Sequence, residues 1–289
     1  MNIHDFIETH RKGFDVIKGL ENKFEYYEFE KRFINHINDN RFSITKKSRR
    51  MHISTLLANY VAWQLLFGKP RIVITFVAGS IQMSRNFNEK VCKAIRDYNI
   101  NIIPEHRTKL EIILGNGSRL RCVTATPDSF CGWTSDIIII DECAFIEKLG
   151  EIMGASTPTL DTEGKLILVS TTNGLEDFYR VWERSIKGQS DFKNLSLNYK
   201  DNPRFNKNEQ WFQDMCRALN MDKRQIQSEL LAEFATWRPK PNKSVKLQIR
   251  VSEEMLYDMQ IMMSNYDISD YSKYVRKLIN DNISSLKRE

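Results

Sequence analysis

The sequence predicts an α/β protein in which a mainly parallel sheet carries helices on both faces. Two apolar runs, Ile72–Val77 and Asp136–Ile140, are continuous, as in strands buried on both sides. They alternate with segments of helical periodicity, which favours strand–helix–strand units. Hydrophobic residues make up 41% and charged residues 28% of the 289 residues, a mixture typical of a globular chain that builds a core.

Each further element follows from hydrophobic spacing and from turn residues. Gly68 and Pro70 end the helix before the first apolar strand, and Gly115–Ser118 is a turn between two hairpin strands. In chain order we predict helical structure at 2–40, a short strand at 41–45, helix 54–67, strand 72–77, helix 84–98, hairpin strands 110–114 and 119–125, strands 136–140 and 165–170, and helices 175–187, 207–219 and 222–234.

Charge and cysteine content limit the classes of protein to consider. The net charge of +6 permits a polyanionic partner without requiring one. The five cysteines are scattered without a CxxC pair, so neither a disulfide framework nor a zinc site is indicated. The sequence has no apolar run near the ~18 residues of a membrane span and no apolar signal core in Met1–Arg11. We expect a cytoplasmic protein with no membrane partner.

The strongest local motif is a buried strand that ends in two acids, Asp141 and Glu142, after four isoleucines. In ATPases, the first acid of such a pair holds Mg²⁺ and the second polarises the attacking water. Two surface acids that cap a strand would give the same pattern.

A second strand, Lys165–Ser170, runs into small polar residues that could sense a terminal phosphate. An ordinary strand-to-helix turn, with Asn173 and Gly174 supplying positive φ, is the alternative.

The third motif is the strand–loop–helix at Arg41–Phe67, which has no glycine and lacks the pattern GxxxxGK[ST]. Ile53 stands where a lysine would precede Ser54. The loop and the helix start still offer phosphate or Mg²⁺ ligands: Lys47, Ser48, Arg49, Arg50, Ser54 and Thr55.

Taken in order, these motifs resemble the ATPase domain of the tailed-phage terminase large subunit, the DNA-packaging motor, over roughly Glu25–Phe234. The most specific stretches are 141–146 and 170–182, with support from Thr126–Asp128, Gly132 and the end of the match at 230–234. The resemblance implies a P-loop NTPase-like fold with ATP and Mg²⁺ as cofactors.

The resemblance also implies roles for individual residues. Asp141 is similar to the acid that holds Mg²⁺, with Ser54 as a further ligand, and Glu142 to the catalytic base. Arg49 falls on the arginine that follows the serine of the family's phosphate loop. The coupling motif that links hydrolysis to motion falls on Ser170, Thr171, Thr172 and Asn173.

Nucleotide contacts follow from the same resemblance. Some family members carry the phosphate lysine at the start of the loop, as Lys-Ser-x-Arg, which makes Lys47 the candidate, beside Ser48, Arg50, Ser54 and Thr55. A decayed site with an exposed Lys47 is the alternative. Phe29 and Glu30 fall where the family often places an aromatic–glutamine pair for adenine, although an ionised Glu30 only accepts hydrogen bonds.

Two departures from the family pattern have consequences. Cys131 precedes Gly132 where many relatives have an arginine proposed to act on a neighbouring subunit's ATP, so we expect slow hydrolysis unless Arg121 or Arg85 substitutes. The family normally continues with a nuclease domain, but 289 − 234 = 55 residues follow Phe234. We therefore expect that this chain does not cut DNA by itself.

A change of composition near Arg238 predicts four parts: an N-terminal helical segment (1–40), the ATPase-like domain (41–237), a linker (238–244) and a small C-terminal domain (245–286). The last resembles a ribbon-helix-helix domain, whose paired strands enter the DNA major groove. Lys246, Gln248 and Arg250 alternate on its strand as base-reading residues, and Ser269 caps a helix that could hold a phosphate. A docking or dimerisation appendage is the alternative.

The leading hypothesis is a viral packaging-motor subunit that couples ATP hydrolysis to translocation of double-stranded DNA in the infected bacterial cytoplasm. The implied partners are further copies of the chain, in a ring or a dimer, with a portal protein, a small terminase subunit and a separate nuclease. The alternative is a catalytically weakened DNA-binding or regulatory protein that reads DNA through Lys246, Gln248 and Arg250.

Overall fold

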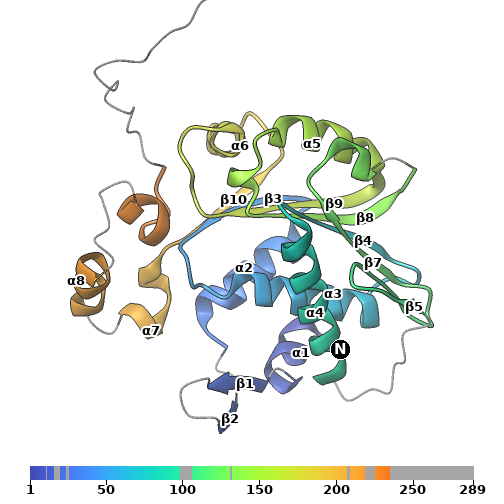
Figure 1. The fold of residues 1–289 in the computed structure, drawn as a ribbon, viewed down its shortest axis with the longest axis horizontal. Helices are drawn as coiled ribbons and strands as arrows, with labels where there is room; N and C mark the ends of the chain where they lie inside the picture. The colour runs from blue at the N-terminus through green and yellow to red at the C-terminus, as the bar shows by residue number, and fades with distance from the viewer. Residues whose placement is uncertain are drawn as a thin grey trace, which may run out of the picture. The chain divides into compact units, whose positions relative to one another are not determined.

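An eight-stranded sheet with the strand order β10-β3-β9-β8-β4-β7-β6-β5 forms the centre of the fold (Figure 1). This computed structural model describes residues 1–10, 12–15, 20–23, 26–97, 106–130, 132–206, 209–218 and 225–234. The chain divides into two units after Trp237, and every described residue belongs to the first. No helix among the described residues is long and apolar enough to cross a membrane.

Six of the strands run parallel, which confirms the predicted mainly parallel sheet. They are β3 (Phe42–Lys47), β4 (Val73–Ala78), β7 (Arg119–Thr124), β8 (Ser135–Asp141), β9 (Leu160–Ser170) and β10 (Lys193–Leu197). Two short antiparallel strands, β5 (His106–Arg107) and β6 (Glu111–Ile113), extend one edge.

The register of the central strands sets the position of the predicted motifs. Strand β9 lies between β3 and β8, and Val169 pairs with Thr45 on one side and with Asp141 on the other. The ends of these three parallel strands are therefore level. The loop after β3 and the acids at the end of β8 consequently meet at one edge of the sheet, where ligands of open α/β sheets bind.

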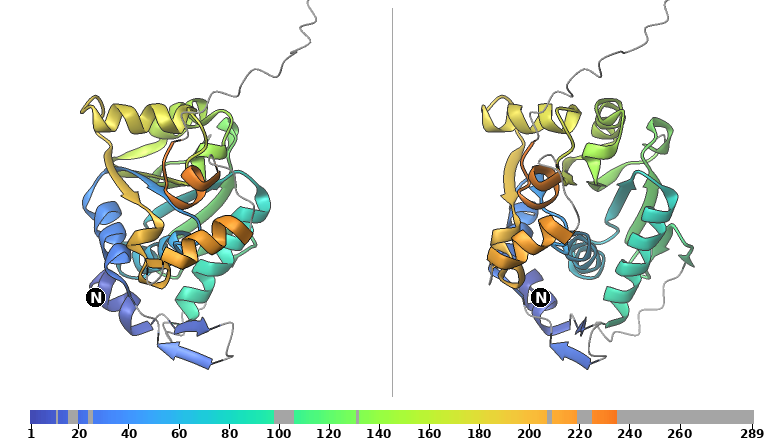
Figure 2. Two further views of the ribbon diagram at one scale, coloured as in Figure 1. Left: turned by 90° about the vertical axis from the view of Figure 1, so that its left-hand side faces the viewer. Right: turned by 60° about the vertical axis from the view of Figure 1, so that its left-hand side comes forward.

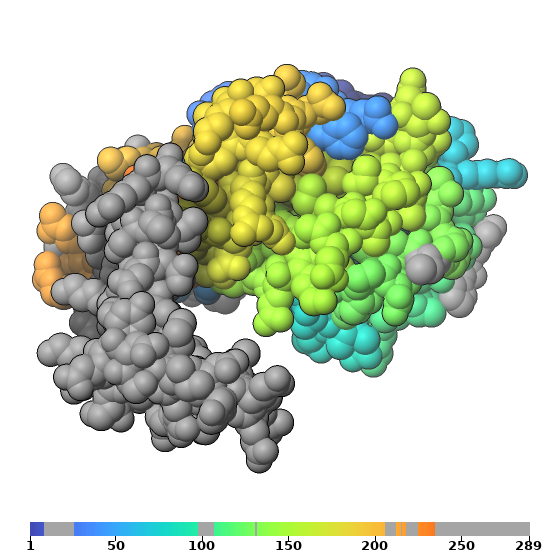
Figure 3. Space-filling model, turned by 90° about the horizontal axis from the view of Figure 1, so that it is seen from above, coloured from blue at the N-terminus to red at the C-terminus, as the bar shows by residue number. Residues whose placement is uncertain are grey.

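Helices cover both faces of the sheet, as the two further views confirm (Figures 1 and 2). One layer consists of α1 (Ile3–His10), α2 (Glu28–Asp39), α3 (Ile53–Phe67) and α4 (Ile81–Asp97), and the other of α5 (Leu149–Ser156) and α6 (Asp177–Ile186). Figure 3 shows the second layer from above, in green to yellow. The short α7 (Pro203–Asn206) and α8 (Glu209–Ala218) lie beyond the β10 edge in Figure 1.

Strand β8 shows how the sequence produces the two cores. Side chains alternate across a strand, so Ile137 and Ile139 pack with α1–α4, whereas Ile138 and Ile140 pack with α5 and α6. All four are 3% exposed or less. Burial of each isoleucine contributes about 1.5–3 kcal/mol, which explains why this strand is apolar throughout.

Two of the helix predictions are wrong in part. The segment 2–40 contains an antiparallel strand pair, β1 (Lys12–Asp15) and β2 (Leu20–Lys23), between α1 and α2. Gly13 lies in this part, and glycine costs about 1 kcal/mol in a helix. The helix predicted at 222–234 is described from residue 225, as a π-helical turn (Ile226–Leu230) that gives way to irregular backbone, with Ala232 at φ 52°.

Candidate active site

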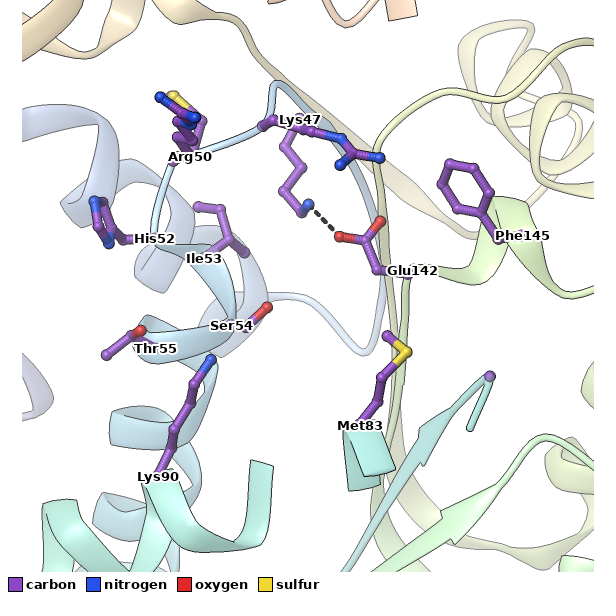
Figure 4. A pocket seen from close by; sticks show the side chains of 13 residues that line it. Lys47, Arg50, His52, Ile53, Ser54, Thr55, Met83, Lys90, Glu142 and Phe145 are labelled. Atoms are coloured by element: carbon purple, nitrogen blue, oxygen red, sulfur yellow. Dashed lines mark hydrogen bonds and ion pairs between the residues drawn. The ribbon is translucent and has the colours of Figure 1, made fainter. Parts of the chain in front are cut away.

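A cavity of about 590 Å³ opens where β3, β4 and β8 end, beside the start of α3 (Figure 4). Six of the residues that line it were singled out from the sequence: Lys47, Arg49, Arg50, Ser54, Thr55 and Glu142. Lys47 and Glu142 are 95 residues apart in the chain. The fold therefore brings the basic loop, defined here as Lys46–Arg50, into one pocket with Glu142, the second of the two acids.

The two acids at the end of β8 face different partners. Asp141 is 4% exposed, and its Oδ2 accepts a hydrogen bond from the Ser54 hydroxyl at 2.9 Å. Glu142 follows with a left-handed backbone (φ 50°), and its Oε1 lies 2.6 Å from the Lys47 ammonium. Figure 4 shows this ion pair across the pocket. The Lys47 side chain is 8% exposed, so the pair is largely removed from solvent.

Burial and neighbouring charge act differently on the two acids. Burial raises the pKa of Asp141 above its usual value, and the charge of Glu142 adds to the increase. Burial also acts to raise the pKa of Glu142, but the Lys47 ammonium and the Thr171 N–H outweigh it and hold that pKa below its usual value. Glu142 is therefore ionised at neutral pH and able to accept a proton.

The loop between β3 and α3 contains no glycine, yet two of its residues have a left-handed backbone conformation. Arg50 (φ 60°) and His52 (φ 56°) are both left-handed, a conformation that costs a residue with a Cβ about 1–2 kcal/mol. The neighbouring N–H groups are fixed from outside the loop: Ser48 donates to the Leu197 carbonyl at 2.9 Å and Arg49 to the Glu229 carbonyl at 2.8 Å. These two bonds anchor the start of the loop to β10 and to the π-helical turn at Ile226–Leu230.

Each of the four candidate coupling residues forms a hydrogen bond, with Glu142, Ala144 or Glu233 as the acceptor residue. The Ser170 hydroxyl (3.4 Å) and the Thr171 N–H (3.2 Å) both donate to Glu142 Oε2. Asn173 donates to the carbonyl of Ala144 at 3.2 Å. The Thr172 hydroxyl points elsewhere and donates to the carbonyl of Glu233 at 2.7 Å.

Residues 226–234, called here the closing segment, contact both the basic loop and Thr172, which follows the end of β9. The Ser48 hydroxyl donates to the Leu230 carbonyl, and Arg49 forms an ion pair with Glu229. Phe234 packs near Trp182 with ring centroids 6.2 Å apart, and the Lys46 ammonium lies 5.5 Å from its ring. Together with the Thr172 bond, these contacts join the closing segment to β3 and β9.

Three predicted nucleotide ligands do not line the cavity. Ser48 is fully buried and its hydroxyl faces Leu230. Phe29 is a core residue of α2, and the carboxylate of Glu30 accepts the Tyr27 N–H at 3.0 Å. Neither Phe29 nor Glu30 lines the pocket. Their contact with adenine stays a prediction.

Other predicted residues lie elsewhere or outside the described residues. Arg121 lies over the ring of Trp133 at 3.8 Å, and neither it nor Arg85 lines the pocket. Cys131 and the candidate DNA-binding residues lie outside the described residues: Lys246, Gln248, Arg250 and Ser269.

Among the lining residues that no sequence motif singled out as candidates are Met83 and Lys90 of α4 and Phe145 after β8. Met83 and Lys90 are seven residues apart, which places both on one face of a helix. That spacing was visible in the sequence, but nothing in the sequence showed that this face of α4 borders the pocket.

The pocket fits a phosphate group with a divalent cation. The N-cap residue His52 makes no side-chain cap hydrogen bond at the start of α3, and the N-terminus of a helix favours an anion. The Ser54 hydroxyl lines the pocket and bonds to the buried carboxylate of Asp141, and both are oxygen ligands of the kind Mg²⁺ prefers. In the part of the chain that the structure describes, no group of three His, Cys, Asp or Glu residues could hold a metal.

Comparisons with known proteins identify a family and a fold. A sequence model of the family described as "Terminase large subunit, T4likevirus-type, N-terminal" matches residues 47–273. The match covers the basic loop, the acid pair and the coupling residues, and it continues into most of the segment for which we predicted a separate domain. It gives no support to the ribbon-helix-helix interpretation of that segment.

Solved structures show the same fold at low sequence identity. A mutant ATPase domain of the large terminase of Thermus phage P74-26 is 18% identical, with a TM-score of 0.58 over 73% of this chain and 95% of that one. The HK97 bacteriophage large terminase is 16% identical, with a TM-score of 0.61 over 80% of this chain and 54% of that one.

The large terminase of a thermophilic bacteriophage shows the fold with nucleotides bound. Its complex with ADP is 13% identical, with a TM-score of 0.57 over 72% of this chain and 53% of that one. Its complex with ATP-gamma-S is 12% identical, with a TM-score of 0.56 over 72% and 52%. The chain thus matches about half the length of this protein and of the HK97 protein.

Proposed function

Because this chain belongs to the terminase large subunit family of the T4-like-virus type, we propose that it binds ATP with Mg²⁺ in the pocket between α3 and β8 and hydrolyses it to move double-stranded DNA. The observation that carries the proposal is the contact of Lys47 with Glu142, beside that of Ser54 with Asp141. These contacts gather a phosphate-binding cation, a general base and two Mg²⁺ ligands at one helix N-terminus.

Each residue contributes through the contacts described above. Lys47 and Arg50 neutralise phosphate oxygens, and Asp141 with Ser54 holds Mg²⁺, which offsets negative charge on the phosphates when bound. Glu142, once Lys47 turns toward phosphate, accepts the proton of the attacking water. Thr171 keeps the Glu142 carboxylate in place through its N–H.

Steady-state ATPase assays of the full chain, with and without duplex DNA, test the proposal. Replacement of Glu142 by Gln removes the proton acceptor but keeps the side-chain shape, so turnover should fall about 10²–10⁴-fold. The matched control is Glu147→Gln, an exposed glutamate nearby in the sequence. Lys47→Ala should abolish nucleotide binding. Equal turnover of wild type and Glu142→Gln would contradict the proposal.

A second candidate function is a DNA-binding or regulatory protein that keeps the fold but does not turn over ATP. The observation in its favour is Ile53 at the start of α3, where the phosphate lysine of the usual loop is missing. Nucleotide binding without Glu142-dependent hydrolysis would identify this function.

We also propose that DNA, further copies of the chain and packaging components such as a portal protein and a small terminase subunit are its partners, on the basis of family membership. The DNA-reading role of Lys246, Gln248, Arg250 and Ser269 rests on sequence alternation alone and is part of this proposal.

A further inference from the structure

The wall of the pocket carries four cationic side chains: Lys47, Arg49, Arg50 and Lys90. Two already have acidic partners, because Lys47 pairs with Glu142 and Arg49 with Glu229. Lys90 is an exposed residue that forms no ion pair or hydrogen bond with another described residue. An unpaired ammonium at the edge of a pocket with one lining carboxylate gives that pocket an excess of positive charge.

The structure of α4 directs Lys90 into the cavity. Phe87 and Val91 are buried and pack that helix on the core, which fixes its rotation. Met83 and Lys90, seven residues apart, occupy the face that borders the pocket. Figure 4 shows the Lys90 amine extended toward the start of α3, near Ser54 and Thr55.

The first three residues of α3, which line the pocket beside Lys90, carry no positive charge. The first helical residue of α3 is Ile53, which is 2% exposed and apolar. Ser54 and Thr55 follow it with hydroxyl groups only. Positive charge near the N–H groups of α3 therefore comes from the loop before the helix and from Lys90 on the adjacent helix.

We propose that Lys90 is a second phosphate-binding lysine, which contacts the phosphate tail of a nucleoside di- or triphosphate from α4. The role follows from charge balance. While Lys47 remains on Glu142 it neutralises the carboxylate, and a phosphate at the start of α3 then depends on other cations. Lys90 supplies one from a side of the pocket that the basic loop does not occupy. This inference rests on the proposed nucleotide site and deepens it.

The test is an equilibrium titration of the full chain with Mg²⁺ and either ATP-gamma-S or ADP. Lys90→Ala should weaken both affinities about 10- to 100-fold, as expected for loss of a charged hydrogen bond, and should flatten their dependence on salt. Lys90→Arg should retain most of the affinity, because the charge and reach remain. The matched control is Lys93→Ala on the same helix, whose ammonium pairs with Asp97 away from the pocket.

The outcomes separate this inference from the proposed function. If wild type binds nucleotide, Lys47→Ala weakens binding and Lys90→Ala does not, the role of Lys90 is refuted while the site stands. Equal losses in Lys90→Ala and Lys93→Ala also refute it, because they show a general charge effect. If the wild-type chain binds neither nucleotide, the proposed function fails, and the role of Lys90 fails with it.

Discussion

The Lys47–Glu142 contact combines a cation that is 8% exposed with a carboxylate that is 27% exposed. Such a pair is stabilising only while both groups keep their charge, since loss of one partner leaves the other desolvated and unpaired. The pair therefore links the chemistry of the site to the stability of the folded chain. It also means that a phosphate group competes with Glu142 for Lys47.

This link predicts a pH-dependent stability difference between wild type and Glu142→Gln. The folded pKa of Glu142 is lowered, so its contribution, about 1.5–3 kcal/mol for a hydrogen bond to a charged group, is complete above the unfolded pKa of about 4.3. It is lost as pH falls through the lowered folded pKa. Urea unfolding between pH 7 and pH 3 measures it. The exposed Glu147→Gln should show no such trend, and a difference that is as large at pH 3 as at pH 7 would contradict the assignment.

Single residues were predictable where chemistry fixes them locally. Asp141 and Glu142 end an apolar strand, and that pattern alone placed them at a sheet edge. Lys47 was a candidate because Lys47–Arg50 resembles the family's displaced Lys-Ser-x-Arg pattern, and the structure places it in the pocket. Lys90 was not, because its importance depends on which face of α4 turns to α3, and that rotation is decided by the packing of Phe87 and Val91.

Among the elements, the closing segment contacts two separate parts of the site region. It receives hydrogen bonds from Ser48 and Thr172, which belong to the basic loop and to the end of β9. These bonds connect the loop directly to residues that continue toward the C-terminal part of the chain. The closing segment is a physical route from the pocket to residue 234.

Two adjacent threonines provide a test of this route. The Thr172 hydroxyl donates to the Glu233 carbonyl, whereas the Thr171 hydroxyl is buried with no hydrogen-bond partner among the described residues. Thr172→Val should cost about 1–2 kcal/mol of unfolding free energy, and Thr171→Val should be neutral or stabilising. Urea unfolding without nucleotide measures both. Equal effects of the two substitutions would show that the bond to the closing segment does not stabilise the fold.

Element prediction succeeded where periodicity and burial agree. The apolar runs of β4 and β8 and the stripe of α3 matched the structure within a residue or two. The strand β10 was missed, because its edge position leaves it mostly exposed and without an apolar pattern. The helix predicted at 222–234 ends earlier than predicted, and residues 231–234 have irregular backbone. In this stretch the Glu233 carbonyl accepts a hydrogen bond from Thr172, a contact distant in sequence that local periodicity cannot reveal.

At the scale of the whole molecule, the described fold ends at residue 234, whereas the family match, residues 47–273, continues beyond it. Residues 41–234 carry the sheet, the pocket and the coupling contacts, whereas 235–289 lie outside the described residues. The predicted DNA-reading face lies entirely in the second region.

A truncation separates the two regions. If residues 238–289 contact DNA through Lys246, Gln248 and Arg250, a chain that ends at Trp237 should lose most of its salt-dependent affinity for duplex DNA and keep its affinity for nucleotide. Fluorescence anisotropy at two salt concentrations measures the first and titration with ATP-gamma-S the second. The full-length triple alanine variant of these residues is the control for the deletion. Unchanged DNA affinity in both variants would rule out this face.

The left-handed residues Arg50 and His52 have one more consequence, which concerns entropy. A loop without glycine has fewer conformations to lose, and its shape is already held by bonds to Leu197 and Glu229. A preorganised phosphate cradle gives up little disorder when the anion arrives, so calorimetry should find a small entropic penalty for nucleotide binding. Glycine at both positions should increase that penalty while relieving the backbone. On this view, rigidity in the loop compensates for the missing lysine at Ile53.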